Sequence, residues 1–491
     1  MFGVHTEGGG DLIVNEGSIR ALGDGVNMST GGNEVVNFGT IVADGDGVDF
    51  NISDGNTLTN YGRIGGGDEG VEFSGGDQVV INHGEIFSSD RSVGNEAVEA
   101  LTNVGETSSL FNYGRIAGAG AFGGGSGEET LVNRGVMTGV VATGGGDDVL
   151  RNSGLLDGAV DLGGGADWFA NAGEVAGDVA LGGGNDRFFG QDGRVEGAVD
   201  GEGGNDGFRG GAGEEDLRGG AGNDILEGGA GGDAVEGGAG FDRASYAGSA
   251  GGVAIDLARG LAMGGDANGD TLTSIEFLEG STQNDALYGT DGANWLIGGT
   301  GDDVLQGRGG NDNLRGGAGA DQLIGGTGVD TAIYDTSREG VVVDLGAGTG
   351  SGGEANGDAL SNVENVIGSN ANDAIFGNGA ANSLVGNAGN DVIAGGGGDD
   401  VIDGRAGNDR MNGGSGADTF LRRPNEGRDT ILDFQDGLDT LDLSAFSFAN
   451  TSAATLGAAN VAGDVVFTFA GGDTLTVETI AFAQLQDDIA I

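Results

Sequence analysis

The sequence predicts an all-β solenoid, in which short strands stack coil upon coil, and three observations lead to this prediction. The first 200 residues repeat short β-forming runs and an Asn-x-Gly turn about every 20 residues. Residues 201–421 contain three blocks of a repeated nonapeptide rich in glycine and aspartate. Glycine occupies 114 of the 491 positions, and each glycine in a helix costs about 1 kcal/mol relative to alanine. A helical fold is therefore excluded for most of the chain.

The composition restricts the kinds of partner that the protein can have. The formal net charge is −57, and all 20 basic residues are arginine. Nucleic acids and anionic membrane surfaces both require basic protein surface, so neither is an expected partner. Regularly spaced carboxylates instead favour hard cations such as Ca²⁺. Apolar residues make up 37% of the chain, which indicates a folded protein once the charge is neutralised.

The sequence lacks cysteine, and neither an ordinary signal peptide nor a membrane span is expected. The absence of cysteine excludes disulfides and a thiol nucleophile. The stretch MFGVHTEGGGDLIV has no basic segment followed by an apolar core, so we expect no ordinary signal peptide. No apolar run approaches the roughly 18 residues of a membrane span. Any export signal is therefore expected elsewhere in the chain.

Residues 1–142 are predicted to form a parallel β-helix. The turn motif begins as VNEGSI at residue 14 and recurs as VNFGTI, TNYGRI, INHGEI, FNYGRI and VNRGVM. A unit of about 20 residues with β-forming runs and an Asn-x-Gly turn is typical of one coil. We expect the turn asparagines to stack as a structural ladder with no catalytic role. They are Asn15, Asn37, Asn60, Asn82, Asn112, Asn133, Asn152 and Asn171.

Residues 143–200 combine this coil with the nonapeptide. The stretches TGGGDDVLR, LGGGADWFA and LGGGNDRFF place Asp148, Asp167 and Asp186 at 19-residue intervals, each before a coil turn. We therefore expect both halves of the chain to stack as one continuous solenoid. The coils before residue 140 lack this aspartate register, so we expect them to stay partly structured without calcium.

Three nonapeptide blocks follow, and two similar linkers separate them. The blocks are predicted at residues 201–245, 280–333 and 368–421. The linkers, residues 246–279 and 334–367, contain GVAIDLARGLAMGGDANGDTLTSIE and GVVVDLGAGTGSGGEANGDALSNVE. A linker together with a block is therefore one duplicated module.

The template G-G-x-G-x-D-x-U-x, where U is apolar, has a physical explanation. Its first six residues must turn sharply and bring carbonyl oxygens together, which requires the positive φ angles that glycine allows. The aspartate adds a charged oxygen, and x-U-x forms a short strand that buries U. Stacked loops then offer the all-oxygen shell of six to eight ligands that Ca²⁺ prefers, whereas Mg²⁺ needs a tighter octahedron.

These units closely resemble the RTX (hemolysin-type) calcium-binding repeats of secreted Gram-negative proteins, and the resemblance is strong over residues 143–421. It implies a parallel β-roll with two nonapeptides per coil and Ca²⁺ between the loops, held by the position-six aspartates and by glycine carbonyls. The implied aspartates are Asp148, Asp167, Asp186, Asp206, Asp224, Asp233, Asp242, Asp285, Asp303, Asp312, Asp321, Asp330, Asp373, Asp391, Asp400, Asp409 and Asp418. The implied glycines are Gly219, Gly220, Gly222, Gly228, Gly229, Gly231, Gly298, Gly299, Gly301, Gly316, Gly317, Gly319, Gly395, Gly396 and Gly398.

Some units depart from the template. Glu215, Asn294 and Asn382 replace the position-six aspartate. Gln283 and Ala371 replace the fourth-position glycine in the units of Asp285 and Asp373. We expect the sites at these units to be weak, empty or completed by solvent.

Residues 422–491 are predicted to form a β-rich cap and to carry an export signal. The stretch ADTFLRRPNEGRDTILDFQDGLDTLDLSAF resembles the segment that caps the β-roll in serralysin-like proteins. The terminal DDIAI resembles the uncleaved C-terminal signal of type I secretion systems. An ordinary last strand is the alternative for these five residues.

The motifs favour a protein without catalytic activity. The chain has two histidines, His5 and His83, and it has neither the HExxH zinc motif nor a G-x-S-x-G nucleophile elbow. The enzymatic alternative is a polysaccharide-binding or polysaccharide-modifying β-helix, such as a lyase or a mannuronan epimerase with an RTX tail. Trp168 and Trp295, at outward positions of their repeats, could then stack on sugar rings. An adhesive or surface-layer protein is the structural alternative.

The sequence thus predicts a secreted, extracellular protein, free or associated with the cell surface, that binds several Ca²⁺ ions and depends on them to fold. No catalytic residue and no other cofactor are expected. The expected partners are calcium ions, the type I secretion machinery and an extracellular or cell-surface polysaccharide.

Overall fold

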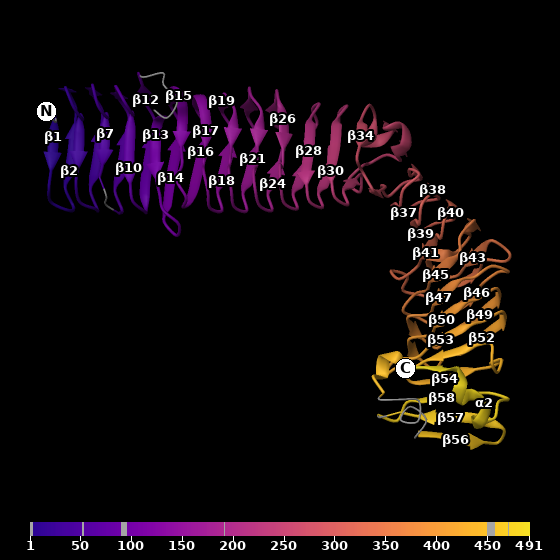
Figure 1. The fold of residues 1–491 in the computed structure, drawn as a ribbon. Coiled ribbons are helices and arrows are strands. Elements are labelled where there is room, and N and C mark those ends of the chain that lie inside the picture. The colour runs from indigo at the N-terminus through magenta and orange to yellow at the C-terminus, as the bar shows by residue number, and fades with distance from the viewer. Residues whose placement is uncertain (1–2, 52–53, 90–95, 191, 449–456, 470) are drawn as a thin grey trace. The chain divides into compact units, whose positions relative to one another are not determined.

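The structure is a computed structural model, and almost all of its regular elements are short β-strands (Figure 1). The chain divides into two compact units. The first comprises residues 1–245 and 266–275, and the second comprises residues 246–265 and 276–491. The structure describes residues 3–51, 54–89, 96–190, 192–448, 457–469 and 471–491.

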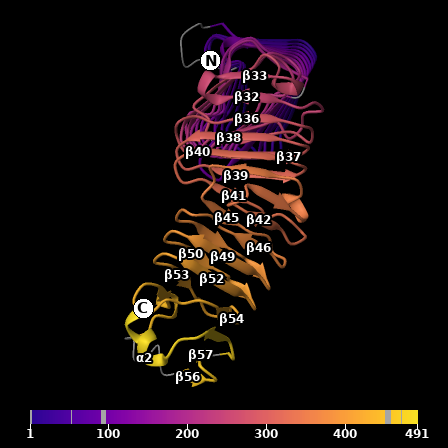
Figure 2. The same ribbon diagram turned by 90° about the vertical axis from the view of Figure 1, so that its right-hand side faces the viewer.

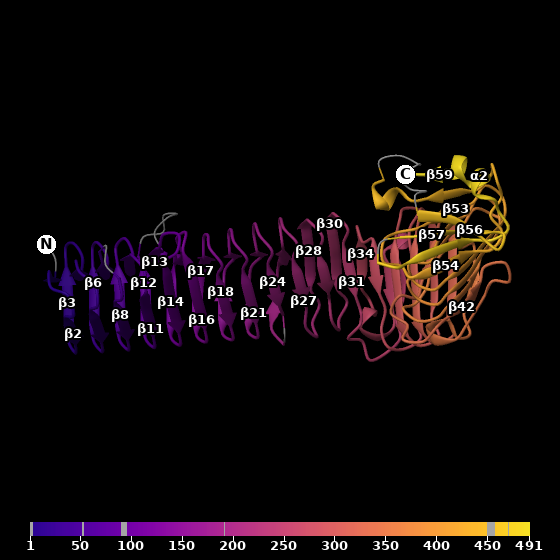
Figure 3. The ribbon, with the colours of Figure 1, turned by 90° about the horizontal axis from the view of Figure 1, so that it is seen from below.

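Unit 1 begins as a parallel β-helix with three strands per coil, and each strand pairs with its equivalent in the next coil. In row one, Leu12 is opposite Glu34 and Asn15 is opposite Asn37, which is a register of one 22-residue coil. Figure 3 shows this row in chain order from β2 to β27. Row one comprises β2 (Leu12–Asn15), β5 (Glu34–Asn37), β8 (Thr57–Asn60), β11 (Gln78–Asn82), β14 (Thr107–Asn112), β16 (Glu128–Asn133), β18 (Val149–Asn152), β21 (Trp168–Asn171), β24 (Arg187–Phe189), β27 (Gly207–Arg209), β29 (Ile225–Glu227) and β31 (Arg243–Ser245).

Row two runs from the first coil to the end of unit 1, and all of its pairings are parallel. It comprises β1 (Val4–Thr6), β4 (Val26–Met28), β7 (Val48–Phe50), β10 (Val71–Ser74), β13 (Glu96–Leu101), β15 (Arg115–Gly123), β17 (Val136–Ala142), β20 (Val160–Asp161), β23 (Val179–Ala180), β26 (Ala198–Asp200), β28 (Asp216–Ala221), β30 (Ala234–Ala239) and β34 (Thr271–Thr273).

Row three follows the Asn-x-Gly turns and is shorter than the other two. Its last strand is β25, next to the point where nonapeptides replace the longer repeat. In the coils that follow β25 only two strands remain, because a pair of nonapeptides is too short to form a third strand. Unit 1 therefore confirms a β-helix that continues into a β-roll. Row three comprises β3 (Ser18–Ala21), β6 (Thr40–Ala43), β9 (Arg63–Gly66), β12 (Glu85–Ser88), the first halves of β15 and β17, β19 (Leu155–Asp157), β22 (Glu174–Val175) and β25 (Arg194–Val195).

Unit 2 repeats the two-stranded coil (Figure 2). Its register is 18 residues, for example between Trp295 and Asn313. Row four comprises β35 (Phe277–Glu279), β37 (Trp295–Thr300), β39 (Asn313–Ala318), β41 (Thr331–Ile333), β45 (Asn365–Ile367), β47 (Ser383–Val385), β50 (Val401–Asp403), β53 (Thr419–Leu421), β55 (Thr440–Asp442) and β59 (Ile489–Ala490). Row five comprises β32 (Ala254–Asp256), β36 (Ala286–Tyr288), β38 (Val304–Gly309), β40 (Gln322–Thr327), β44 (Ala359–Ser361), β42 (Val342–Asp344), β46 (Ala374–Phe376), β49 (Val392–Gly397), β52 (Arg410–Ser415), β54 (Arg428–Ile431) and β58 (Thr474–Val477).

The linkers and the C-terminal end add short antiparallel pairs to these rows. Both linkers form an antiparallel hairpin at equivalent positions, β32 with β33 (Leu261–Met263) and β42 with β43 (Thr349–Ser351). The C-terminal end carries the antiparallel strands β56 (Ala458–Val461), β57 (Asp464–Thr468) and β58, then the short helix α2 (Phe482–Leu485). The β-rich end of the predicted fold is therefore confirmed. The remaining elements are β48 (Ala388–Gly389), β51 (Ala406–Gly407) and the 3₁₀ turns η1 (Leu257–Arg259), η2 (Gly265–Ala267), η3 (Gly353–Ala355), η4 (Ser444–Phe446) and η6 (Gln486–Asp488).

The core is a file of apolar side chains inside each coil. Leu287, Leu305 and Leu323 occupy the U position of successive coils and are fully buried. Burying such a side chain contributes about 1.5–3 kcal/mol relative to leaving it exposed. Among the described residues, no helix has the length and apolar character needed to cross a membrane. Because the apolar side chains fill the inside of the coils, the loops between the strands are available to bind ligands.

Candidate metal centres

The position-six aspartates form ladders at the starts of the strand rows. The backbone N–H of Asp312 donates to Oδ1 of Asp330 at 2.8 Å, one coil later. The N–H of Asp303 likewise donates to Oδ1 of Asp321 at 2.9 Å. In unit 1 the same bond links Asp148 to Asp167 at 2.7 Å and continues to Asp242 in steps of 18 to 20 residues. One carboxylate oxygen of each aspartate therefore holds neighbouring coils in register.

The second carboxylate oxygen has no such role. In fourteen of the predicted aspartates Oδ2 is buried and has no hydrogen-bond partner among the described residues. A buried charged oxygen without a partner is strongly unfavourable, so a bound cation is the expected partner. The donor set therefore fits calcium. The fourteen are Asp148, Asp167, Asp186, Asp206, Asp224, Asp233, Asp303, Asp312, Asp321, Asp330, Asp391, Asp400, Asp409 and Asp418.

The first glycine of each unit leaves room for these oxygens. A Cβ atom on Gly219 would clash with Oδ2 of Asp224 and with the carbonyl oxygen of Gly237 in the next coil. Gly298 is in the same position relative to Asp303 and Gly316. The space between adjacent loops is therefore lined by carboxylate and carbonyl oxygens, as a calcium site requires. Gly228, Gly316 and Gly395 are placed in the same way against the aspartates of their own units.

The second and fourth glycines serve the turn itself. Their φ angles lie between 94° and 158°, a region that residues with a side chain rarely adopt. This conformation explains why the template requires glycine at both positions. The predicted glycines in this class are Gly220, Gly229, Gly299, Gly317 and Gly396 at position two, and Gly222, Gly231, Gly301, Gly319 and Gly398 at position four.

Burial and mutual repulsion raise the pKa of the aspartates. Loss of solvent raises the pKa of Asp167 to about 8, and the charges of Asp148 and Asp186 add to the shift. Loss of solvent also raises the pKa of Asp321 to about 7, and the charges of Asp358 and Asp303 add to this shift. Hydrogen bonds from the backbone oppose both shifts. Without a cation, the aspartates of these rows therefore bind protons instead.

The departures from the template satisfy their own polar atoms. Oδ2 of Asp285 accepts a hydrogen bond from the N–H of Ser281 at 2.6 Å. The same bond joins Ser369 to Asp373 at 2.7 Å. Asn294 accepts from Thr290 through Oδ1 and donates through Nδ2, so it carries no charge and buries no unpaired oxygen. These units therefore lack the unpartnered oxygen that marks the other aspartates.

The ladders contain acidic residues that the nonapeptide pattern did not identify. The N–H of Glu129 donates to Oδ1 of Asp148 at 2.7 Å, so Glu129 extends the row by one coil toward the N-terminus. Its stretch GGSGEETLV has the template glycines and carries glutamate at position six, as at Glu215. Asp270 and Asp358, in the linkers, accept from Asp233 and Asp321 in the same way. Their signal was the shared GD-x-L of the two linkers, which lies outside the nine-residue period.

The turn asparagines form the predicted structural ladder. Nδ2 of Asn60 donates to Oδ1 of Asn82 at 2.9 Å, and the equivalent bond links every neighbouring pair from Asn15 to Asn171. His83, in the middle residue of its turn, stacks between the rings of Tyr61 and Tyr113 at 5.0 Å and 4.9 Å. These contacts confirm a structural role for the asparagines and place His83 in an exposed aromatic stack.

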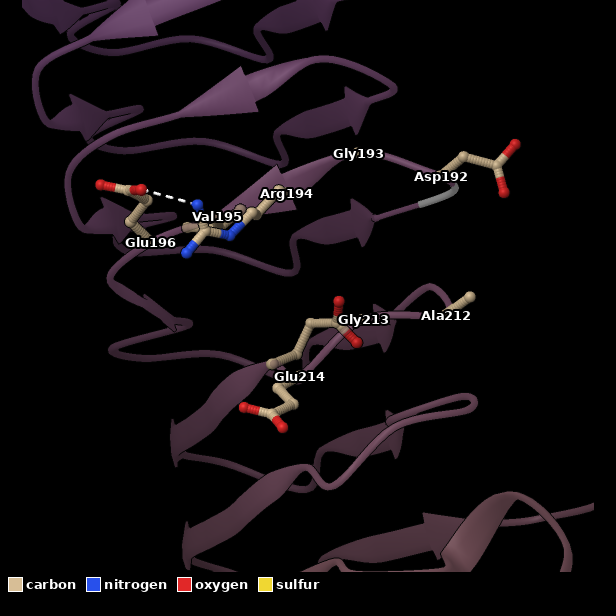
Figure 4. Close-up of a pocket in the computed structure, with 9 residues that line it drawn as sticks. Asp192, Gly193, Arg194, Val195, Glu196, Ala212, Gly213 and Glu214 are labelled. Atoms are coloured by element: carbon tan, nitrogen blue, oxygen red, sulfur yellow. Dashed lines mark hydrogen bonds and ion pairs between the residues drawn. The ribbon is translucent and has the colours of Figure 1, made fainter.

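The two tryptophans and a pocket of unit 1 are places where a sugar or another small ligand could bind. The ring of Trp168 lies under the guanidinium of Arg151 at 4.6 Å, and Trp295 stacks on Phe277 at 5.6 Å. The pocket is lined by Asp192–Glu196 and Ala212–Glu215. In it Arg194 pairs with Glu196 at 2.7 Å, while the Asp192 side chain points away from both (Figure 4). The pocket thus offers carboxylates and one paired arginine.

Comparison with known proteins identifies the repeats. The family model of the RTX calcium-binding nonapeptide repeat (4 copies) matches residues 209–244, 270–305, 297–332, 361–393 and 385–420. No curated protein matches the sequence. A solution structure of the AlgE6R3 subunit from the Azotobacter vinelandii mannuronan C5-epimerase is 29% identical, with 25% of this chain and 79% of that chain covered and a TM-score of 0.21.

A second solved structure is the extracellular lipase LipA from Serratia marcescens. It is 21% identical, with 42% of this chain covered and a TM-score of 0.20. The alignment spans 40% of the lipase chain. At TM-scores this low, neither alignment describes the fold of the whole chain.

Proposed function

Because this chain carries RTX calcium-binding nonapeptide repeats, we propose that it is a secreted protein that folds outside the cell when its repeats bind calcium. The observation that supports the proposal most directly is the set of fourteen buried Oδ2 atoms without a partner. At Asp224 and Asp400 a glycine carbonyl of the next coil lies close to this oxygen, and calcium prefers such a shell of oxygens. The glycines at positions one, two and four are proposed to supply carbonyl ligands beside these aspartates.

Calcium concentration would provide the signal for folding. Extracellular calcium modules bind with dissociation constants of about 10⁻⁴–10⁻³ M, far above cytosolic free calcium. Inside the cell the aspartates would repel one another, and the glycine-rich loops would retain their conformational entropy. Outside, each site at 100 times its dissociation constant contributes about 2.7 kcal/mol to stability. A dozen such sites exceed the stability of a typical domain.

Circular dichroism and the hydrodynamic radius of the full chain test this proposal. In chelator the chain should lose β signal and expand, and millimolar calcium should restore both. Magnesium at the same concentration should have little effect, because it retains its waters and requires a smaller octahedral site. A chelated chain that keeps its full β signal and its compact radius would refute calcium-dependent folding.

We propose that the C-terminus directs export through a type I secretion system. The terminal acidic pair and three apolar residues support this proposal, and Ile489 and Ala490 also form β59 beside β55. A chain lacking residues 487–491, produced in a Gram-negative host with a type I exporter, should remain inside the cell. The full chain should accumulate in the medium. Equal export of the two chains would overturn this role.

We further propose a structural or adhesive role without catalysis, in which the repeated coils present the same surface many times to an extracellular or cell-surface polysaccharide. The support is the regular solenoid and the lack of a recognised catalytic motif in the sequence. Incubation with alginate and pectate in calcium should give neither cleavage products nor a change in uronic-acid epimers by NMR. Turnover of either polymer would favour the enzymatic alternative.

A further inference from the structure

A second series of carboxylates lies in the first coils of unit 1, outside the nonapeptides. The sequence reads DGVN from Asp24, DGVD from Asp46, EGVE from Glu69 and EAVE from Glu96. Each stretch enters a strand of row two, β4, β7, β10 or β13. The strands pair in parallel register, so Asp49 is opposite both Asn27 and Glu72. Glu72 is in turn opposite Glu99.

Two rows of acidic side chains therefore run along neighbouring coils. The structure brings these side chains together in groups of three. Within each group, one carboxylate oxygen from each residue lies within 4.8 Å of the others. Adjacent groups share Asp46 or Glu69. The three groups are Asp24–Asp46–Asp49, Asp46–Glu69–Glu72 and Glu69–Glu96–Glu99. We call these seven residues the N-terminal carboxylate file.

Three members of the file are buried, the other four are partly buried, and none has a cationic partner among the described residues. Asp46, Asp49 and Glu69 are 8%, 5% and 9% exposed. Across the described part of the chain, none of the seven carboxylates forms a salt bridge. Burial, together with the neighbouring carboxylates, raises the pKa of Asp49 to about 7 and that of Glu72 to about 8. The charges therefore destabilise these coils unless a cation compensates them.

Asp49 gives an independent indication of a ligand. Its Oδ2 accepts hydrogen bonds from Nδ2 of Asn27 at 2.7 Å and from Nδ2 of Asn51 at 2.6 Å. Its Oδ1 is buried and has no hydrogen-bond partner among the described residues. The same combination, one oxygen held and one oxygen unpartnered, distinguishes the aspartates of the RTX rows. Here the two asparagines orient the carboxylate, and the remaining oxygen is available to a metal ion.

We propose that the N-terminal carboxylate file binds hard divalent cations, with calcium preferred, at up to three sites between coils of row two. Carboxylates alone supply the protein ligands, and water completes each shell. Calcium accepts six to eight oxygens at variable angles and binds carboxylates through one or two oxygens, whereas magnesium demands a near-ideal octahedron. The N-terminal coils would then depend on calcium, contrary to the expectation from the missing nonapeptide register.

Hydrogen exchange of the full chain, read by mass spectrometry, tests the file separately from the RTX rows. In wild type, calcium should slow exchange in peptides covering residues 24–101 by about tenfold once it exceeds ten times the dissociation constant. Asp49→Asn and, separately, Glu72→Gln should each reduce this slowing, most strongly in the coils around the changed residue. Both variants should still gain protection in residues 201–421, because that gain reports the RTX rows alone.

The matched control is Glu16→Gln combined with Glu34→Gln, which removes two exposed charges elsewhere in the same coils. It should behave as wild type. In chelator, Asp49→Asn should protect the N-terminal coils at least as well as wild type, since the amide removes repulsion without removing the hydrogen-bond acceptor. Calcium-dependent slowing that is equal in Asp49→Asn, Glu72→Gln and wild type would overturn the proposal.

Ion counting provides the second measurement. Chains dialysed against calcium and analysed by plasma mass spectrometry should show at least one ion fewer per chain in Asp49→Asn than in wild type or the Glu16/Glu34 control. Equal counts in all three chains would contradict a site at Asp49. Equal slowing of exchange by magnesium at the same concentration would contradict the preference for calcium.

Discussion

At the scale of single residues, the two oxygens of a position-six aspartate divide the work of structure and binding. Oδ1 accepts a backbone hydrogen bond from the preceding coil, and Oδ2 remains buried without a partner in fourteen of these residues. Asparagine fits the loop, but it has no charge to offer a cation. Asn294 shows that the loop accepts an amide at this position.

Asp312→Asn tests this division, with Asp285→Asn as its matched control. Asp312→Asn should lower the calcium count by at least one ion and raise the calcium midpoint modestly, because neighbouring coils are nearly independent in a solenoid. Asp285→Asn should leave the count unchanged, since Ser281 already satisfies Oδ2 of Asp285. Calorimetry and ion counting measure both effects. Equal loss of calcium in the two variants would contradict the assignment.

Gly219→Ala tests the space beside Oδ2. The new Cβ would clash with Asp224 and with the Gly237 carbonyl, so the loops must separate at a cost of about 1–3 kcal/mol. Gly207→Ala is the control, because a Cβ there meets nothing closer than 3.9 Å. In saturating calcium, thermal unfolding should shift to lower temperature for Gly219→Ala alone. Matching transitions for the two variants would show that the space is not occupied as described.

At the scale of elements, the repeat period predicts the strands and much of the candidate site. The nine-residue period places the U residues in the core and the aspartates at the strand starts, because every unit has the same glycine-rich turn followed by the same short strand. Asp270 and Asp358 were not predicted, since the linkers interrupt this period. The N-terminal carboxylate file was missed because its residue type changes from coil to coil and its spacing varies. Its members become neighbours only when the strands are paired.

The raised pKa values predict how the rows respond to pH. Burial raises the pKa of Asp167 to about 8 and that of Asp391 to about 7, from an ordinary value near 3.8. In the calcium-free chain the folded state therefore binds more protons than the unfolded state between pH 4 and about 8. The stability that these protonated carboxyl groups contribute is greatest below pH 4 and is lost as the pH rises through these folded-state values.

Calcium binding should show the opposite trend, because protons and calcium compete for the same oxygens. The calcium midpoint should rise as the pH falls from 8 to 6, and binding at pH 7 should release protons. Titrations in buffers of different ionisation enthalpy count those protons. A midpoint that does not change between pH 8 and 6, with no proton release, would show that these carboxylates do not bind the metal.

At the scale of the whole molecule, a chain with a net charge of −57 must fold around many acidic groups. Its apolar files stabilise each coil, while the aspartate rows oppose stacking until cations neutralise them. Stability in such a solenoid is nearly a sum over neighbouring coils, so calcium acts locally many times over. The fold class follows from periodicity alone. The positions of the unpartnered oxygens require the structure, because they depend on contacts between coils.

We propose that calcium binds beside the unpartnered Oδ2 atoms of the aspartate rows. Anomalous diffraction from crystals of the full chain grown in calcium tests this claim most directly. Anomalous peaks should appear between successive loops next to aspartates such as Asp224, Asp312 and Asp400, and none should appear next to Oδ2 of Asp285 or Asp373. A map at saturating calcium that shows no peaks along residues 201–421 would contradict it.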